Sequence, residues 1–421
     1  MIPFLIIFAL HTPAMKCKFA ILTFLHLLPS VTAVAQEKDS TKNYRKYDLL
    51  PAISYAPETG LTLGIIGYRY LRLGKNYPTR QSNIDFVAVY TTRNQIIVES
   101  NWDIFTDGDK FRFRGFIGYN LYPDRNYGLG NDANALIREY DLNNGVKTDS
   151  SDFNYLNFSI QRITFRPVFL MKFRDKIYGG LRFDLEYQYA MKIIPDQYVF
   201  LSEGSAISLM QNNNTGLRSG TGFALVYDSR DNILNARKGI FLDYSALFYG
   251  KLLGSDYTYS YSRLDARKYF NPVKNHSIAL RANFIFSRTD DIVVPMRGLA
   301  RVGGHDFMRG YFRGTFQDKN LASLEAEYRL PFWSDDVDAP LYKIWKRLGM
   351  VAFVSGAQVY GYSGNFSFDK FNYAVGTGLR VLFNPESRVN IRIDYSWGLS
   401  KNSAGPDGRQ TGLYFFLSEA F

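Results

Sequence analysis

The sequence has only one cysteine, Cys17, and four histidines among its 421 residues. A single cysteine cannot form a disulfide within the chain, and its place near the N-terminus leaves the rest of the protein without a thiol. Beyond residue 35 no apolar run reaches about eighteen residues, which excludes membrane-spanning helices. The sequence also lacks a phosphate-binding loop and a cluster of metal ligands. We therefore predict no cofactor and no metal.

The first 35 residues have the pattern of a secretory signal peptide. The basic segment Met15–Lys18 precedes the apolar segment Phe19–Leu28, and Ala33-Val34-Ala35 forms a cleavage site. Because the residues before Met15 are also apolar, Met1 and Met15 both stand as candidates for the true start. Cleavage after Ala35 would also remove the only cysteine.

Residues 36–48 form a short charged lead. An independently folded domain needs at least roughly forty residues, so we predict that no periplasmic domain precedes the main body of the protein. That body, residues 49–421, is assigned below to a single barrel.

Aromatic residues are abundant, at 16% of the chain with 31 Tyr and 34 Phe, and the mean hydropathy is −0.20. Outer-membrane barrels place aromatic residues in girdles and on their lipid face. The net charge of +11 raises the possibility of nucleic-acid binding. However, Lys and Arg are scattered at alternate positions rather than clustered, which favours a polar lumen or an anionic lipid surface. We predict outer-membrane lipid as a partner and no nucleic acid.

Alternation of apolar and polar residues with period two predicts an all-β, antiparallel transmembrane barrel. In the clearest case, Val389–Leu399, apolar and aromatic residues alternate with Asn390, Arg392, Asp394 and Ser396. About sixteen strands are expected, at Leu50–Ala56, Thr59–Leu73, Asn83–Thr91, Gln95–Phe105, Lys110–Asn120, Phe153–Lys172, Lys176–Lys192, Gly220–Asp228, Gly239–Tyr249, Asp256–Phe270, Ser277–Arg288, Asn320–Trp333, Gly349–Val359, Asn372–Phe383, Ser387–Leu399 and Gln410–Phe421.

Loop lengths predict the orientation of the barrel. If the first strand starts in the periplasm, the long connections Tyr122–Asp152, Ile193–Leu217 and Thr289–Lys319 all become extracellular, as bacterial barrels require. The connection Ser334–Leu348 is the one longer periplasmic turn. The chain ends at Phe421, in register with Leu417, Phe415 and Leu413, which is similar to the terminal signature of outer-membrane barrels, although Glu419 interrupts it.

The loop Thr289–Lys319 is far longer than a hairpin needs, and its centre places Arg309 and Tyr311 between glycines. Gly303, Gly304, Gly310 and Gly314 permit tight backbone paths. This pattern favours a loop that holds one guanidinium at a specific place. The alternative is a surface loop whose arginines face water.

Three motifs give a resemblance to the BamA/TamA-like bacterial surface antigen superfamily. The sixth-loop motif is matched by Val302-Gly303-Gly304 and Met308-Arg309-Gly310-Tyr311. A turn motif is matched by Asp228, Arg230, Asp231, Asn232 and Gly239, with Ala236 where proline is usual. Tyr122–Asn131 resembles an early loop motif. The resemblance covers essentially the whole chain after residue 35 and represents a form without periplasmic POTRA domains.

In that family the sixth loop folds into the lumen, and its arginine meets acidic residues on nearby strands. The resemblance implies Glu325 as the partner of Arg309, with Glu327 on the same lumen face. The second family partner corresponds to Ser355, where serine replaces aspartate, so we expect one anionic partner instead of two. The alternative for both glutamates is a solvated row of lumen charges.

An enzymatic role is not supported. His305-Asp306 could suggest a base and its orienting carboxylate, but neighbouring residues point apart and no nucleophile motif accompanies them. Glu325 and Glu327 could suggest acid–base catalysis, but an arginine partner would keep both ionised. We predict that the protein is not an enzyme.

The resemblance implies a function in inserting or translocating other envelope proteins through the seam between the first and last strands. Pro51 and Pro57 flank a short first strand around Ile53 and lack an N–H for the ladder, which favours a weak seam against Gly412–Phe421. Client capture would then require a periplasmic or lipoprotein partner, or the turn Ser334–Leu348. The alternative is a passive pore or a structural outer-membrane barrel.

Overall fold

A computed structural model describes residues 47–74, 79–132, 156–193, 215–273, 276–289, 294–305, 307–331, 347–384, 388–400, 409–417 and 419–421. The predicted signal peptide, almost all of the lead, Asp306 and most of Ser334–Leu348 lie outside these residues. In the described part of the chain, no helix is long and apolar enough to cross a membrane.

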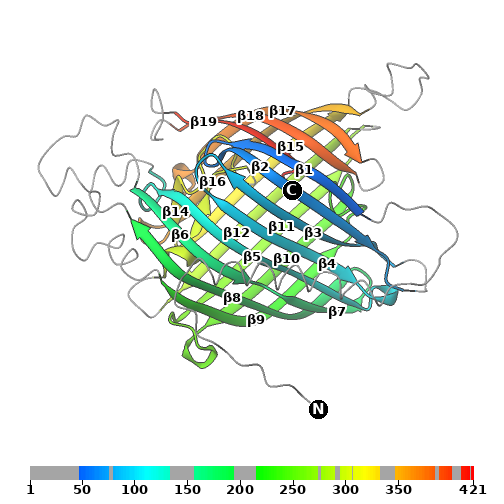
Figure 1. Cartoon of the computed structure of the whole chain (residues 1–421). Helices are drawn as coiled ribbons and strands as arrows, with labels where there is room; N and C mark the ends of the chain where they lie inside the picture. Colours follow the sequence, from blue (N-terminus) through cyan, green and yellow to red (C-terminus); the bar gives the residue numbers. More distant parts are fainter. Residues whose placement is uncertain are drawn as a thin grey trace, which may run out of the picture. The chain divides into compact units, whose positions relative to one another are not determined.

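The chain forms an all-β, closed antiparallel barrel of sixteen strands (Figure 1). The barrel strands are β1 (Tyr47–Ala56), β2 (Gly60–Leu71), β3 (Ser82–Thr91), β4 (Ile96–Phe105), β5 (Phe111–Asn126), β6 (Leu156–Phe165), β7 (Val168–Arg174), β8 (Ile177–Ile193), β9 (Gly216–Asp228), β10 (Gly239–Tyr249), β11 (Tyr259–Phe270), β12 (Ser277–Arg288), β15 (Asn320–Pro331), β16 (Leu348–Tyr360), β17 (Asn372–Asn384), β18 (Val389–Gly398) and β19 (Thr411–Leu417).

Two of these labels describe one strand that crosses the barrel once. β6 and β7 are separated only by Arg166 and Pro167, and both pair with β5 and with β8. A separate two-stranded ribbon consists of β13 (Ala300–Val302) and β14 (Phe316–Asp318). Single 3₁₀ turns occupy Asp107–Asp109, Lys251–Leu253, Met296–Gly298 and Phe368–Lys370. The predicted fold class and strand number are therefore confirmed.

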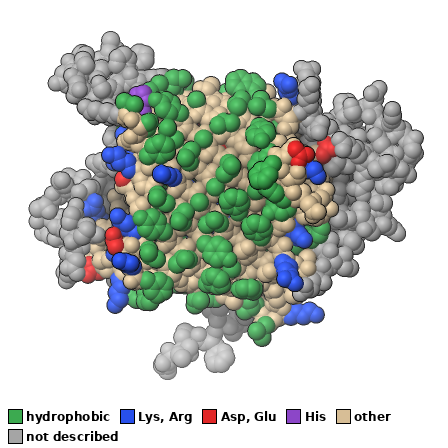
Figure 2. Space-filling model, turned by 180° about the vertical axis from the view of Figure 1, so that it is seen from behind, with side chains coloured by type: hydrophobic (Ala, Val, Ile, Leu, Met, Phe, Trp, Pro, Cys, Tyr) green, Lys and Arg blue, Asp and Glu red, His purple; other side chains and the backbone are tan. Residues whose placement is uncertain are grey.

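The alternation in the sequence separates an apolar outside from a polar inside. Along β18, Ile393, Tyr395 and Trp397 are exposed, whereas Asp394 and Ser396 between them are buried. Figure 2 shows hydrophobic side chains spread over the middle of the outer surface, with most charged side chains toward its two edges. A surface of this kind matches the hydrocarbon layer of a membrane, and pairing of neighbouring strands satisfies the backbone there.

The barrel closes where β1 meets β19, and this closure is the thinnest pairing in the sheet. β1 pairs with β2 at ten positions and β18 with β19 at seven, but β1 and β19 share one register pair, Tyr55 with Phe415. Figure 1 shows blue β1 and red β19 side by side at this seam. Pro51 lies within β1, Ile53 points outward with 54% exposure, and Pro57 follows in the turn to β2.

The predicted cause of the thin seam needs correction. β1 starts at Tyr47, so it is longer than predicted, and Pro51 does not end it, since it pairs opposite Ile65. The short partner is β19, which contains Gly412 and ends at Leu417. A proline is tolerated at an edge position because only one neighbour loses a hydrogen bond.

The C-terminus also departs from the prediction. Phe421 was expected in the outward register of Leu413 and Phe415, but it is 8% exposed, and its carbonyl accepts a hydrogen bond from Arg329 Nη2 at 3.0 Å. Glu419 accepts hydrogen bonds from Arg380 Nε at 2.8 Å and from Asn390. A carboxylate facing lipid is costly, so the residues around Glu419 turn inward to these partners.

Candidate functional site

The glycines of the long loop shape its path beside the barrel wall. Gly303 has φ = 109°, and a Cβ there would approach the Phe312 carbonyl oxygen to 2.0 Å. Gly310 has φ = 112°, and a Cβ there would lie 2.8 Å from the backbone of Trp397 on β18. Both positions require glycine because of their dihedral angles and their close backbone contacts. Gly304 also has a positive φ, 95°.

Apolar side chains anchor this loop tip. Met308, Tyr311 and Phe316 are buried in one cluster whose other members include Tyr127, Leu321 and Val359. The Tyr311 hydroxyl donates to the Tyr373 carbonyl at 2.9 Å and accepts from the Ser400 N–H at 2.9 Å. Tyr311 therefore holds the tip against β17 and the residue pair that follows β18.

Arg309 is fully buried among carboxylates of the barrel interior. Its Nη1 donates to Asp394 Oδ2 at 2.7 Å, and its Nη2 donates to Glu327 Oε1. Glu325 Oε1 lies 3.7 Å from the same Nη2. The Phe353 ring centroid is 3.6 Å from the guanidinium carbon, within the range of a cation–π contact. Glu327 and Asp394 are buried positions on β15 and β18, on the faces opposite the exposed residues of those strands.

The two carboxylates that bind Arg309 also bind other arginines. Arg329 donates to Glu327 Oε2 from Nε at 2.9 Å and from Nη2 at 2.8 Å. Arg380 donates to Asp394 Oδ1 at 2.6 Å, and Arg392 to Asp394 Oδ2 at 3.2 Å. We call the set Arg309, Glu325, Glu327, Arg329, Arg380, Arg392, Asp394 and Glu419 the Arg309 network.

The Arg309 network reaches the C-terminus by two routes. One runs through Glu327 and Arg329 to the carbonyl of Phe421, and the other through Asp394 and Arg380 to Glu419. Four arginines face four carboxylates in the network, so its charges balance. Breaking one member of a buried, paired set is costly because it leaves a charge without compensation.

The expected partners of Arg309 were partly wrong. Glu325 is the more distant carboxylate, while Glu327 and Asp394 make the direct contacts, so the expectation of one anionic partner is overturned. Asp394 was visible in the sequence as a polar-face residue of the clearest strand. Periodicity assigns a side chain to a face of a strand, but it does not say which strand a distant loop reaches.

Ser355 lies directly opposite Glu325 on the neighbouring strand β16. It is buried, and its hydroxyl has no hydrogen-bond partner among the described residues. Because Asp394 already supplies a second carboxylate to Arg309, an aspartate at position 355 would add a charge beside Glu325 that has no counterpart.

We therefore predict that Ser355→Asp lowers barrel stability by about 1 kcal/mol or more, since like charges directly opposite in a sheet repel. The measurement is the urea midpoint of unfolding in lipid vesicles. Ser355→Ala is the matched control and should stay within about 0.5 kcal/mol of the wild type, because its hydroxyl bonds to nothing. A more stable Ser355→Asp protein would show that Arg309 still lacks a partner.

The turn motif builds the short-turn end of the barrel and, within the described part of the chain, forms no hydrogen bond or ion pair with Arg309. Asp228 is fully buried and accepts hydrogen bonds from Arg230 Nε and Nη2, both at 2.9 Å, and from Arg112 Nη1 at 3.0 Å. Gly239 has φ = 107°, and a Cβ there would lie 2.3 Å from the Ser229 carbonyl oxygen. These contacts give the start of the motif a structural role.

The remaining motif residues fix the turn itself. Asn232 Oδ1 accepts the N–H groups of Leu234 and Asn235, both at 2.8 Å. Asp231 accepts the N–H of Arg237 at 2.9 Å and Arg388 Nη1 at 2.6 Å. Burial favours a higher pKa for Asp231, but these hydrogen bonds outweigh it and hold the pKa below its usual range.

None of the predicted site residues forms a catalytic arrangement within the described part of the chain. His305 stacks on Phe416, with ring centroids 4.0 Å apart, and its Nδ1 lies 4.0 Å from Glu58. Glu327 pairs with Arg309 and Arg329, which favour its ionised form and suit an ion-pair network rather than a general acid. No group of three or more possible metal ligands occurs among the described residues.

Comparisons with known proteins agree on the type of barrel. A family model described as the Omp85 superfamily domain matches residues 71–421. Among solved structures, BamA from Haemophilus ducreyi lacking POTRA domains 1–3 is 12% identical, with a TM-score of 0.54, over 90% of this chain and 71% of that one. CdiB from Escherichia coli is 8% identical, with a TM-score of 0.52, over 89% of this chain.

CdiB from Acinetobacter baumannii is 12% identical over 89% of this chain, with a TM-score of 0.48. This chain spans 63% and 60% of the two CdiB chains, respectively. At these identities the matches establish the fold alone. No curated protein matches the sequence.

Proposed function

This chain belongs to the Omp85 superfamily, and from that premise we propose that it assists the insertion or translocation of other envelope proteins by opening the seam between β1 and β19. Barrels of this superfamily lie in the outer membrane, in contact with lipid, and are non-enzymatic transport and insertion proteins. This agrees with the prediction that the chain is not an enzyme.

The observation that carries the proposal is the single register pair that joins Tyr55 to Phe415. A closed barrel has no edge strand, so admitting a client strand requires one existing pairing to break. The cost is lowest where the fewest ladder bonds are lost, and every other neighbouring pair of long strands shares many more positions. The seam is therefore the least costly place for a new strand to enter.

The Arg309 network supports the same proposal. Glu419 and Phe421 follow directly after the seam strand β19, and both are bound to arginines of this network. Arg309 thus holds, through shared carboxylates, the chain end that an opening seam would have to release. We propose that Gly303, Gly304, Gly310 and Tyr311 serve to place Arg309 there. A periplasmic or lipoprotein partner that delivers clients is part of this proposal.

Electrical recording tests the proposal against a passive pore. In planar bilayers the wild-type barrel should show no steady, porin-like conductance, because Arg309 and its buried partners occupy the interior. A passive pore requires an aqueous channel that stays open. Steady conductance in every reconstituted barrel would contradict the proposal and favour the pore. The control is a mock preparation from cells without the protein, which excludes contaminating porins.

A further inference from the structure

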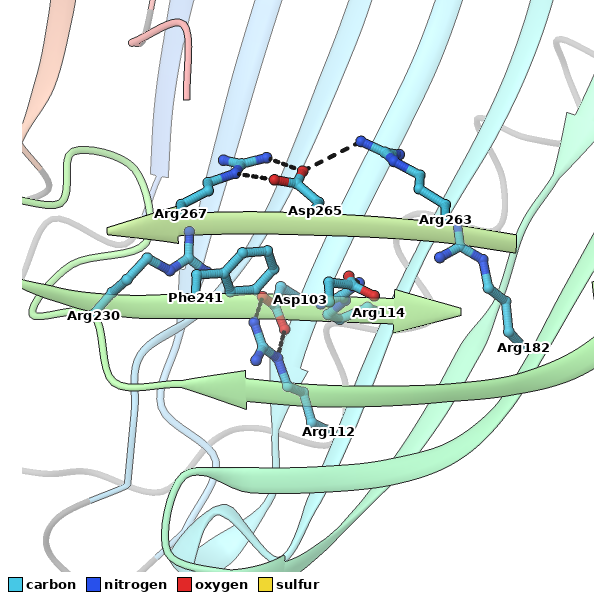
Figure 3. A pocket seen from close by; sticks show the side chains of 10 residues that line it. Asp103, Arg112, Arg114, Arg182, Arg230, Phe241, Arg263, Asp265 and Arg267 are labelled. Atoms are coloured by element: carbon cyan, nitrogen blue, oxygen red, sulfur yellow. Dashed lines mark hydrogen bonds and ion pairs between the residues drawn. The ribbon is translucent and has the colours of Figure 1, made fainter. Parts of the chain in front are cut away.

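We propose that a second, separate site inside the barrel binds an anionic small molecule, specifically a phosphate group carried on a hydroxyl-bearing compound. The site is a cavity of about 290 Å³ on the inner wall formed by β4, β5, β8, β10 and β11 (Figure 3). It is lined by ten residues: Asp103, Arg112, Arg114, Arg182, Arg230, Phe241, Asp243, Arg263, Asp265 and Arg267. None of them belongs to the Arg309 network.

Six arginines and three aspartates line this cavity, and Asp228 behind the lining pairs with two of the arginines, Arg112 and Arg230. With Asp228 counted, positive charge still exceeds negative charge by two. The excess is visible at Asp265, whose Oδ2 lies 2.7 Å from Arg267, 3.2 Å from Arg263 and 3.4 Å from Arg281. One carboxylate oxygen is shared among three guanidiniums. Cations with too few partners in a confined interior favour a bound counter-charge.

Arg182 offers the clearest hydrogen-bond donor without a partner. Its Nη1 donates to Ser245 Oγ at 3.3 Å, while its Nε is buried and has no hydrogen-bond partner. Among the described residues, no carboxylate lies within ion-pair distance of it. Figure 3 shows the side chains of Arg182, from β8, and Arg263, from β11, on the same side of the cavity, with the ion pair drawn from Arg263 to Asp265 and none from Arg182. An anion placed there would give Arg182 Nε the partner it lacks and would add to the single carboxylate that Arg263 shares with other arginines.

The other arginines are held in fixed positions around the same space. Arg112 makes a bidentate contact with Asp103, at 2.8 Å from Nε and 2.6 Å from Nη2. The guanidinium carbons of Arg230 and Arg267 lie 4.1 Å and 5.3 Å from the centroid of the Phe241 ring. A guanidinium that is already fixed by ring stacking or by a bidentate hydrogen bond loses little conformational entropy when it binds a ligand. Its planar N–H donors also match the geometry of phosphate oxygens.

One unmet acceptor narrows the chemical class of the ligand. Asp243 pairs with Arg114, but its Oδ1 is buried without a hydrogen-bond partner. A fully deprotonated oxyanion such as sulfate offers this atom no donor, whereas a hydroxyl on the carbon skeleton beside the phosphate would donate to it. The volume suits a ligand at the small end of those that protein pockets hold, about 300 Å³ upward. We therefore assign the site to a phosphorylated polyol, either free or as a lipid headgroup.

The test is calorimetric titration of the detergent-purified barrel with inorganic phosphate, glycerol 3-phosphate and glycerol, at constant ionic strength. We expect saturable binding of one phosphate per barrel, tighter binding of glycerol 3-phosphate, and none of neutral glycerol. Arg182→Gln should weaken the binding of both inorganic phosphate and glycerol 3-phosphate at least tenfold. A preference for glycerol 3-phosphate over a glycerophospholipid of short chain length favours a free ligand, and the reverse a headgroup.

The matched control is Arg162→Gln. Arg162 is another half-buried lumen arginine that hydrogen-bonds to a neutral side chain, Asn120, but it lies outside the cavity and has Glu186 at 3.9 Å. The Arg162→Gln variant should bind inorganic phosphate and glycerol 3-phosphate as tightly as the wild type does. No saturable binding, or equal weakening by the two variants, would overturn the site, and equal affinity for the two phosphates would overturn the polyol assignment. If Arg182→Gln fails to fold, Arg182→Lys retains the charge, loses Nε as a donor and should still weaken binding. Failure of this proposal leaves the seam proposal untouched.

Discussion

Joining Tyr55→Cys to Phe415→Cys by a disulfide should abolish the function of the barrel, and a reductant should restore it. Among the described residues these two positions form the one register pair between β1 and β19, so a covalent bond there prevents the seam from opening. The measurement is complementation of a deletion strain, read out as growth and as the protein content of the outer membrane. Loss under oxidising conditions with recovery under reducing conditions is the result expected of an insertion or translocation barrel.

The geometry permits this cross-link without distortion. Opposed residues of an antiparallel pair have Cα atoms about 4.5–5.5 Å apart, inside the range of about 4.4–6.8 Å that disulfides tolerate. Tyr55 and Phe415 each continue the outward-facing series of their strands, with Ile53 and Leu413. The only native cysteine, Cys17, lies in the predicted signal peptide, so no other thiol is expected to compete.

A second disulfide controls for rigidity alone. Tyr395→Cys with Leu413→Cys joins β18 to β19, whose seven register pairs already hold them together. Both side chains face outward, as at the seam, so the two cross-links differ only in the pairing they lock. The control should complement in either redox state. Full complementation by the verified, oxidised seam cross-link would reject the proposed function and leave a passive pore or a structural barrel.

The sequence predicted the fold well because a membrane barrel imposes one rule on every strand. Lipid outside and polar groups inside force a period of two, and that period is visible in any single strand, as in Val389–Leu399. The ends of strands were predicted less well. β5 continues to Asn126, six residues beyond its predicted end, because Tyr122 and Asn126 still alternate as buried positions on its inner face.

The site could be predicted only in part, for a physical reason. The glycines and Arg309 mark a loop that holds a guanidinium, and this information is local in the sequence. The choice among Glu325, Glu327 and Asp394 depends on how strands 60 or more residues apart curve around the loop tip, which no local pattern contains. Glu419 shows the same limit. It interrupts an apolar pattern in the sequence, yet it is bound to Arg380 inside the barrel.

Replacing Arg309 by methionine should destabilise the barrel by about 3–5 kcal/mol, toward the lower end of that range because Arg329 and Arg380 still pair with the carboxylates left behind. Methionine keeps most of the side-chain volume, so the main loss is charge. The measurement is the urea midpoint of unfolding in lipid vesicles, together with protease cleavage of the loop. Because the network binds Glu419 and Phe421, the C-terminal residues should also become accessible to carboxypeptidase.

The control is an arginine–aspartate pair of the same length at the surface. Arg388 lies 2.6 Å from Asp231 and its side chain is 36% exposed, whereas Arg309 lies 2.7 Å from Asp394 and is fully buried. Arg388→Met should cost no more than about 1 kcal/mol, since exposed pairs are weak. Equal losses in the two variants would mean that burial adds nothing and that Arg309 is an ordinary loop charge.

Double-mutant cycles decide which carboxylate Arg309 depends on. Combining Arg309→Met with Asp394→Asn should give a coupling energy of at least about 1 kcal/mol, because the two groups share a direct hydrogen bond. The cycle with Glu325→Gln should give less, since that contact is 3.7 Å and is not a hydrogen bond. A stronger coupling to Glu325 than to Asp394 would mean that Glu325 is the main partner of Arg309, as the sequence predicted. In that case Asp394 would serve mainly Arg380 and Arg392, and the loop would be held by β15 alone, through Glu325 and Glu327, without the contact to β18 beside the seam.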